Sequence, residues 1–500
     1  MTAMTSGIET RRPERIGVPL ALVSFAGPAA ALLAVAAGPA AILLATLGLV
    51  AAAASVATPG ILFAAYLLVP FYKGALQPYS PIDITVLMAA LNTLQVVPLI
   101  RDRRAHSQSQ TGLTLWFALA LVILAGVLYS PDQDAALARA ATWWALAVVP
   151  ITMGAVRVGS DPRYLRQFLW TLFAMGAVVV ILGAIQMSSS QRLVLLGENT
   201  IEVGRAALLA PLIGITFVLR GGSAAARFAT IALLPMAVAV ALASGSRGPL
   251  LAALLLGAIG TIGAARRTKR INWAALSGLL GLALASIVVV SILSPNMPAL
   301  SIERFAGLGD FIQGTLTGQP GAPRMDASSE IRLRLFDVAL STFEQHPILG
   351  IGTAGFATAS RMALGPIEGQ PYPHNALLQV AAELGLVGLV VLLGLLALAV
   401  SRHLPVGDAV TALRYAFLFF FLNAMVSLDV YSDRMTWGLL LLLLVTDAAR
   451  PGSRLTMEPL EIVTPEAATA QPIGVANAGR DSSRPARRRL VRAQARGADR

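Results

Sequence analysis

Residues 376–400 read ALLQVAAELGLVGLVVLLGLLALAV, and this stretch decides the fold class. Its one charged residue is Glu383. At 1.5 Å per residue, a helix of this length measures about 37 Å, enough to cross the ~30 Å hydrocarbon core of a bilayer. The stretch is rich in Ala, Leu and Gly, and small residues let neighbouring helices pack closely in lipid. We therefore predict a transmembrane helix here.

Blocks of the same kind recur along the whole chain, separated by short polar loops. The chain is 56% hydrophobic and 13% charged, with a mean hydropathy of +0.71, and a soluble domain needs more polar surface than that. We predict an all-α fold, a polytopic bundle of about 12–14 transmembrane helices. The block 59–73 is short, so a re-entrant segment is an alternative there. The expected spans are 17–36, 39–57, 59–73, 82–100, 112–130, 136–156, 164–187, 203–220, 226–243, 247–264, 272–293, 376–400, 407–427 and 434–448.

Basic and non-basic loops alternate between these blocks, and the positive-inside rule places the basic ones in the cytoplasm. The basic loops are 101–104, 157–166, 220–227, 266–270 and 402–403. This pattern predicts a multi-pass protein of the bacterial inner membrane with both termini in the cytoplasm. We expect a cytoplasmic N-terminal segment 1–16, membrane segments 17–293 and 376–448, a periplasmic loop 294–375, and a disordered, Arg-rich cytoplasmic tail 449–500.

The composition excludes several classes of function. The net charge is +12, but the Arg residues lie in short loops and in the tail, which argues against nucleic acid as a partner. The chain has no Cys, and therefore no disulfide, thiol nucleophile or Cys–metal site. Neither a Gly-rich phosphate loop nor an acidic pair with metal-ligand spacing is present, so we expect no cofactor and no metal.

The long loop contains a predicted amphipathic helix at residues 330–345, which read EIRLRLFDVALSTFEQ. Leu333, Phe336, Leu340 and Phe343 are spaced at i, i+3, i+7 and i+10, while polar residues repeat the same spacing on another face. We expect this helix to lie on the membrane surface or over the bundle.

Three basic residues stand at the extracytoplasmic ends of predicted spans, where Arg is disfavoured: Arg205 in GENTIEVGR, Arg247 in SGSRG, and His374. An Arg guanidinium matches phosphate oxygens with two parallel donors, so two of them at one face make a candidate diphosphate clamp. The alternative for each Arg is a lipid phosphate, or an ion pair with an acid such as Glu198 or Glu202. Finding both beside His374 favours the functional interpretation.

His374 is the candidate catalytic residue, because a neutral imidazole can take the proton of a hydroxyl group. The alternative is a structural role, in which His374 caps or forms a hydrogen bond within the loop. Glu383 lies deeper in the same helix and is expected to be structural, with a proton-relay role as the alternative. Asp429 and Asp433 are candidates to orient an Arg or bind an acceptor sugar, or simply to cap the last helix. Weaker phosphate candidates are Arg332 and Arg334 on the amphipathic helix.

Four segments together resemble the O-antigen ligase/polymerase family of bacterial membrane glycosyltransferases. They read GENTIEVGR at 197–205, SGSRGPLLA at 244–252, FEQHPILGIGTAGF at 343–356 and PHNALLQVAAELGLVGL at 373–389. The most specific element is the pattern H-N-x-x-L-x-x-x-x-E-x-G-x-x-G-L that begins at His374. The N-terminal spans and the tail carry no motif of this family.

The resemblance implies a metal-independent, inverting transfer of a glycan from undecaprenyl diphosphate to a hydroxyl acceptor at the periplasmic face. Arg205 and Arg247 would hold the diphosphate, and His374 would activate the acceptor hydroxyl. The acceptor in this family is a growing glycan, lipid A–core or a protein, and the sequence does not choose among them. The alternative function is a secondary transporter or lipid flippase, but the chain lacks the paired internal repeats of such proteins.

Overall fold

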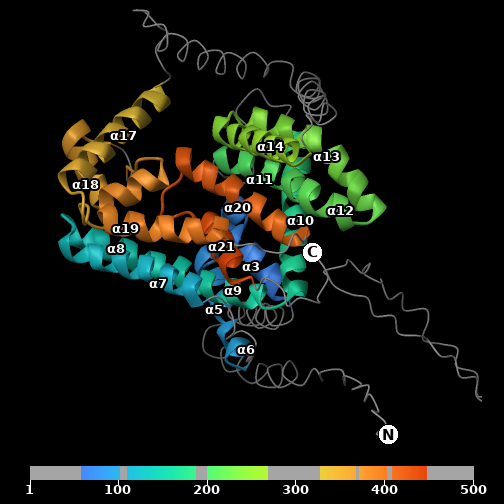
Figure 1. The fold of residues 1–500 in the computed structure, drawn as a ribbon, viewed down its shortest axis with the longest axis horizontal. Coiled ribbons are helices and arrows are strands. Elements are labelled where there is room, and N and C mark those ends of the chain that lie inside the picture. Colours follow the sequence, from blue (N-terminus) through green and yellow to red (C-terminus); the bar gives the residue numbers. More distant parts are fainter. Residues whose placement is uncertain are drawn as a thin grey trace, which may run out of the picture. The chain divides into compact units, whose positions relative to one another are not determined.

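The computed structural model describes residues 58–101, 110–186, 200–268, 327–367, 371–401 and 408–446. Within these ranges the chain forms helices and turns without any strand, which confirms the all-α class (Figure 1). The elements are α3 (Pro59–Leu67), η1 (Val69–Phe71), α4 (Lys73–Leu76), η2 (Gln77–Tyr79), α5 (Ile84–Thr93), α6 (Val96–Arg101), α7 (Gln110–Ala125), η4 (Gly126–Tyr129), α8 (Gln133–Trp143), η5 (Trp144–Val148), α9 (Val149–Gly159), α10 (Pro162–Gln186), α11 (Thr200–Ile213), η6 (Gly214–Val218), α12 (Leu219–Gly221), α13 (Ala224–Ala243), α14 (Arg247–Thr268), α17 (Ala327–Gln345), α18 (Gly355–Leu364), α19 (Ala376–Ser401), α20 (Asp408–Ser427) and α21 (Arg434–Val445).

Seven of the described helical segments are long and apolar enough to cross a membrane. They are Gln110–Tyr129, Gln133–Gly159, Pro162–Gln186, Thr200–Val218, Ala224–Ala243, Ala376–Ser401 and Ala409–Ser427. Each coincides with a predicted span, and shorter apolar helices occupy the predicted spans 82–100, 247–264 and 434–448. The predicted spans 17–36, 39–57 and 272–293, and the segments 1–16 and 449–500, lie outside the described residues.

The block 59–73 does not form one continuous helix. Its helix α3 has nine residues, which is about 14 Å at 1.5 Å per residue and less than half the hydrocarbon thickness. The one-turn helices η1 and α4 follow, with breaks at Leu68 and Tyr72. This segment is nonetheless well packed, because Phe63 and Tyr66 are fully buried.

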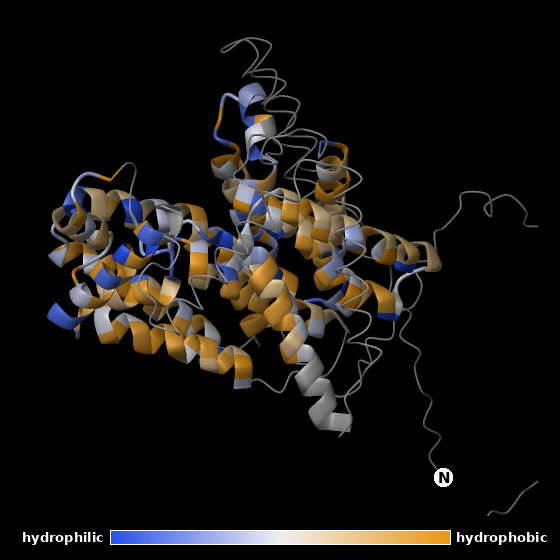
Figure 2. Ribbon diagram, turned by 90° about the horizontal axis from the view of Figure 1, so that it is seen from above, coloured by the Kyte–Doolittle hydropathy of each residue, from blue (hydrophilic) through white to orange (hydrophobic). Residues whose placement is uncertain are grey.

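The core of the bundle is formed around α21, which contacts α3, α7, α9, α19 and α20. Every residue from Met435 to Val445 is buried, as expected for a helix that is apolar on all sides. Figure 2 shows that hydrophobic residues predominate along the described helices. On the outside, Leu254, Ile185 and Val390 each remain more than 60% exposed. Such large exposed apolar side chains are consistent with a surface that contacts lipid.

The predicted amphipathic helix is present as α17, but it packs through a different face from the one that its spacing suggested. Leu335 and Ala339 are buried and form a small cluster with Phe356 of α18 and Ala382 of α19. Leu333 and Leu340, which belong to the predicted apolar stripe, are 43% and 46% exposed. The helix carries apolar residues on two faces, and the contact with α18 and α19 selects the face that contains Leu335.

Helix α19 is interrupted at Gly385, whose φ of 62° and ψ of −157° lie outside the helical region. A side chain at this position would collide with the carbonyl oxygen of Ile348, so glycine is required there. The interruption exposes backbone groups that lipid cannot satisfy. The turn 347–352 supplies their partners through four hydrogen bonds: Ile351 N to Ala382 O (2.9 Å), Gly352 N to Glu383 O (2.9 Å), Leu386 N to Pro347 O (2.8 Å) and Val387 N to Ile348 O (3.2 Å).

Candidate active site

The two candidate Arg residues lie on neighbouring elements. Arg205 is in the second turn of α11, and Arg247 is the first residue of α14, after the turn 244–246. Gly204 packs against this turn so closely that an added Cβ would lie 3.3 Å from Ser246 Cβ. Gly248 in turn faces α20, where an added Cβ would lie 3.9 Å from Ser427 Oγ. The small residues of both motifs therefore bring the backbones of α11, α14 and α20 together.

Arg205 is almost completely buried, with 1% of its surface exposed. Its Nη1 lies 2.5 Å from Glu202 Oε1, and its Nη2 donates to Ser427 Oγ at 2.6 Å. The ion pair with Glu202, which we predicted as an alternative role for Arg205, is therefore formed. The third donor, Nε, has no hydrogen-bond partner within the described part of the chain. A buried guanidinium with one donor unused retains the capacity to bind a further acceptor.

The side chain of Arg247 lies outside the described part of the structure, so only its backbone position is established. Two buried polar atoms close to this backbone are also without partners among the described residues, Ser246 Oγ and Asn423 Oδ1. Asn423 Oδ1 would lie 3.6 Å from a Cβ added to Gly248. The region around the 244–248 turn thus contains more polar capacity than the described chain satisfies.

His374 precedes α19 and has a positive φ of 55°, a conformation that non-glycine residues adopt rarely. Such strain is most often found at functional positions. Its ring contacts that of Tyr372, with the centroids 4.1 Å apart, and its Nδ1 is buried without a described partner. Burial, and after it the positive charge of Arg332, lower the pKa of His374 to about 4. The imidazole is therefore neutral at physiological pH and has a lone pair available.

The two Arg candidates on α17 differ in direction. Arg334 is exposed and pairs with Glu330 at 2.6 Å, one turn earlier on the same helix. Arg332 is half-buried and acts on the pKa values of both His374 and Tyr372. Arg332 therefore lies within electrostatic range of His374, whereas Arg334 is engaged with Glu330.

Tyr372 connects the two sides of the candidate site. Burial raises the pKa of its phenol, the charge of Asp429 adds to that rise, and the charges of Arg205 and Arg332 oppose it. These effects require all three charges to lie within electrostatic range of one hydroxyl group. The residues come from α11, α17 and the α20–α21 loop, so distant segments of the chain converge around Tyr372.

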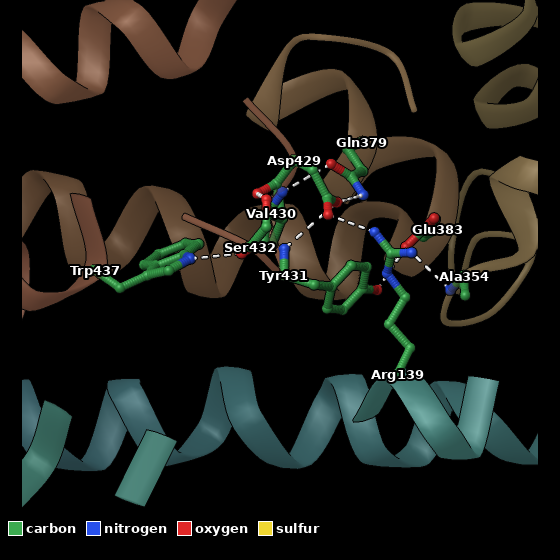
Figure 3. Close-up of polar contacts among 9 residues, drawn as sticks. All are labelled: Arg139, Ala354, Gln379, Glu383, Asp429, Val430, Tyr431, Ser432 and Trp437. Atoms are coloured by element: carbon green, nitrogen blue, oxygen red, sulfur yellow. Dashed lines mark hydrogen bonds and ion pairs between the residues drawn. The ribbon is translucent and has the colours of Figure 1, made fainter. Parts of the chain in front are cut away.

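Asp429 is the centre of a buried network (Figure 3). Its Oδ2 pairs with Arg139 of α8, and its Oδ1 accepts from Gln379 Nε2 of α19 at 2.8 Å. Gln379 Oε1 then accepts from the backbone N–H of Val430 at 2.9 Å. Arg139 also lies over the ring of Tyr431, 5.0 Å from its centroid. Asp429 thus pairs with Arg139, and its role in orienting an Arg or binding an acceptor sugar stays a prediction.

Glu383 contacts neither His374 nor a described cation. Its Oε2 accepts from the Tyr431 hydroxyl at 2.5 Å and from Ala354 N at 3.2 Å. These bonds connect the N-terminal part of α19 to the α20–α21 loop and to the start of α18, which is consistent with a structural role. Asp433 caps α21, because its Oδ1 accepts from Thr436 N at 3.0 Å. Burial raises the pKa of Asp433 to about 6.

Four residues of this region were missed by the sequence interpretation: Arg139, Tyr372, Gln379 and Tyr431. A signal existed for Arg139, which is a cation inside a predicted span. Gln379 and Tyr431 gave no comparable signal, because their partners are distant in the sequence. Within the described ranges no group of three or more His, Cys, Asp or Glu residues could hold a metal ion.

Comparison with known proteins supports the family suggested by the motifs. No curated protein matches the chain. Residues 231–393 match the family model described as O-antigen ligase, and the match includes the 244–248 turn, α17, the 347–352 turn and His374. Together with the apolar spanning helices, this match supports a multi-pass membrane protein that contains a region similar to O-antigen ligases. Residues 231–393 of the chain are therefore similar to the O-antigen ligase family.

Proposed function

We propose that the protein transfers a glycan from undecaprenyl diphosphate to a hydroxyl acceptor at the periplasmic face of the bacterial inner membrane, as a ligase or a polymerase of surface polysaccharide. The family match supports the reaction class. The observation that carries the proposal is that Arg205, which is buried with an unused donor, acts on Tyr372, whose ring contacts a neutral His374. The turn that precedes Arg247 packs against the helix of Arg205. One face of the bundle then offers cations for a diphosphate and a base for a hydroxyl.

In the proposed reaction, the His374 imidazole takes the proton of the acceptor hydroxyl. The oxygen attacks the anomeric carbon of the donor glycan, and the bond from that carbon to the diphosphate oxygen breaks. Its electron pair leaves with the diphosphate, so the configuration at the anomeric carbon is inverted. The negative charge that develops on the leaving group is stabilised by Arg205 and Arg247, because fixed cations in a site of low dielectric act strongly on such charge.

Arg332 extends the same electrostatic arrangement. Its charge depresses the pKa of His374, which keeps the imidazole neutral and able to accept a proton. It also acts on Tyr372, as Arg205 does, so two cations lie within electrostatic range of that hydroxyl group. Fixed guanidinium groups would then carry the leaving-group charge without a divalent ion, which is why we expect the reaction to proceed in EDTA.

The test is in vitro transfer by purified protein with an undecaprenyl-diphosphate glycan and a panel of acceptors in EDTA. Product on lipid A–core identifies a ligase, and a ladder of longer lipid-linked glycans identifies a polymerase. His374→Ala should abolish transfer. His346→Ala is the matched control, because His346 is exposed beyond the end of α17. Transfer that survives His374→Ala would refute the assigned base, and proteoliposome flux without a covalent product would favour the transporter alternative.

A further inference from the structure

A cleft of about 390 Å³ lies between α8 with the following η5 and the loop 429–434. Its volume falls within the range of about 300–1,000 Å³ that small-molecule sites occupy. Trp143 and Leu146 line one wall, while Tyr431 and Arg434 line the other. The cleft therefore combines apolar and aromatic surface with a cation. The residues assigned to donor binding, Arg205 and Arg247, are not among its lining residues.

Two residues that line this cleft each carry a buried N–H group without a partner among the described residues. Trp143 is 1% exposed, and its indole N–H has no acceptor. Arg434 is half-buried, its Nε is buried without an acceptor, and its guanidinium forms no ion pair within the described chain. Burying an N–H donor or a cation without a partner costs free energy, so an unpaired group of this kind is a candidate to bind a ligand.

The one carboxylate that lines the cleft is already engaged. Asp429 accepts from Arg139 and from Gln379, so its charge is paired, whereas Nε of Arg434 and the indole N–H of Trp143 are unused donors. A neutral sugar hydroxyl needs acceptors as well as donors, whereas a phosphate or carboxylate group needs donors and positive charge. The chemistry of the cleft therefore matches an oxyanion attached to an apolar or sugar body.

We propose that the Arg434–Trp143 cleft binds a phosphate or carboxylate group of the acceptor molecule. This assignment rests on the proposed glycosyl transfer and adds an anionic acceptor to it. Asp429 lies in the cleft and also acts on Tyr372, whose ring contacts His374. An acceptor anchored at Arg434 would thus lie in a cleft that Asp429 links electrostatically to Tyr372 and, through its ring, to His374.

The test is ligand binding by the full-length protein in phosphatidylcholine nanodiscs, measured by saturation-transfer NMR at constant ionic strength. The probes are glucose 1-phosphate, glucuronate and methyl glucoside, which share a sugar ring and differ in charge. We expect the two anionic sugars to bind and the neutral one not to bind. Arg434→Gln should weaken their binding by about tenfold or more, the size expected for a lost charged hydrogen bond.

Trp143→Phe, which removes the N–H and keeps an aromatic ring, should weaken anion binding severalfold. Trp144→Phe is its matched control, because Trp144 also has an unpartnered N–H but does not line the cleft. Arg227→Gln controls for charge, since Arg227 is exposed on α13. Unchanged thermal unfolding verifies that each variant folds. Equal binding of charged and neutral sugars, or full binding by Arg434→Gln, would overturn the proposal.

A phospholipid headgroup offers the same chemistry as an acceptor phosphate, and a second set of nanodiscs separates the two sources. If phosphatidylglycerol in the disc abolishes glucose 1-phosphate binding, a lipid headgroup occupies the cleft and the acceptor assignment is wrong. Persistent binding supports the acceptor. His374→Ala should bind the anionic sugars like the unmodified protein, so failure of the transfer reaction and failure of this binding site are distinguishable.

Discussion

The protonation of His374 makes a sharp prediction about the pH dependence of transfer. With a pKa of about 4, roughly 97% of the imidazole is neutral at pH 5.5, whereas a histidine with the ordinary pKa of 6.5 would be only about 9% neutral. If His374 is the base, the transfer rate at pH 5.5 should therefore stay close to its neutral-pH value. An unperturbed histidine would lower it about tenfold.

The pKa can be measured directly, because the chain has only four His residues. Titration of ¹⁵N-histidine-labelled protein in nanodiscs, with His374→Gln to assign its signal, gives the midpoint. We expect the titration midpoint of His374 near pH 4, which is below the pH 5.5 at which transfer should still proceed. Because the pKa is depressed in the folded state, the unfolded chain binds more protons between about pH 4 and 6.5. His374 therefore contributes to stability above pH 6.5 and loses this contribution as the pH falls towards 4.

Two variants on α17 separate electrostatics from burial. Arg332→Gln should raise the pKa of His374 but leave it below 6.5, because burial is the larger cause of the shift. Arg334→Gln should leave it unchanged, since Arg334 is exposed and paired with Glu330. A wild-type midpoint near pH 6.5 would refute the burial of the imidazole, and equal shifts in the two variants would refute a specific effect of Arg332 on it.

Three further changes test other parts of the structure. Arg205→Lys should lower the transfer rate at least about tenfold while membrane insertion stays normal, because lysine lacks the planar guanidinium that bonds to Glu202 and Ser427 together. Arg227→Lys, assayed in parallel, should retain full activity. Gly385→Ala should destabilise the protein by about 1–3 kcal/mol in thermal unfolding, since alanine is strained at φ 62°. Gly394→Ala in the same helix should be tolerated, because the added Cβ would lie 3.7 Å from its nearest neighbour, Leu115. Truncation after residue 452 should leave transfer intact, and an inactive truncated protein would contradict a passive tail.

Much of the fold could be predicted because hydropathy alone specifies an apolar helix in lipid. Every described spanning helix coincides with a predicted block, and the amphipathic helix appears at its predicted place as α17. The packed face of α17 could not be predicted, because two of its faces carry apolar residues and only α18 and α19 decide between them. The break in α19 could not be predicted either, because Gly385 is one of several small residues in this segment. Only its contact with the turn 347–352 distinguishes it from the others.

The candidate site was predictable where a residue was anomalous by itself. Arg205, His374 and Asp433 stand out as polar groups at the ends of apolar blocks, and the structure gives each a defined environment. The network of Asp429 depends instead on Gln379 and Tyr431, which approach it only after α19 and α21 are packed. The cleft beside Arg434 arises between helices about 300 residues apart in the sequence, and no local pattern could reveal it.

The interruption of α19 also bears on how the protein responds to its membrane. Helices commonly adapt to a thinner or thicker bilayer by bending or tilting. Bending at Gly385 is prevented, because opening the angle would break the four hydrogen bonds to the turn 347–352 and expose their groups to lipid. Both halves of α19 must therefore tilt as one rigid piece together with that turn. The orientation of the first part of α19, which carries Gln379 and Glu383, relative to its second part is then independent of acyl-chain length, even though the surrounding lipid varies with temperature and growth.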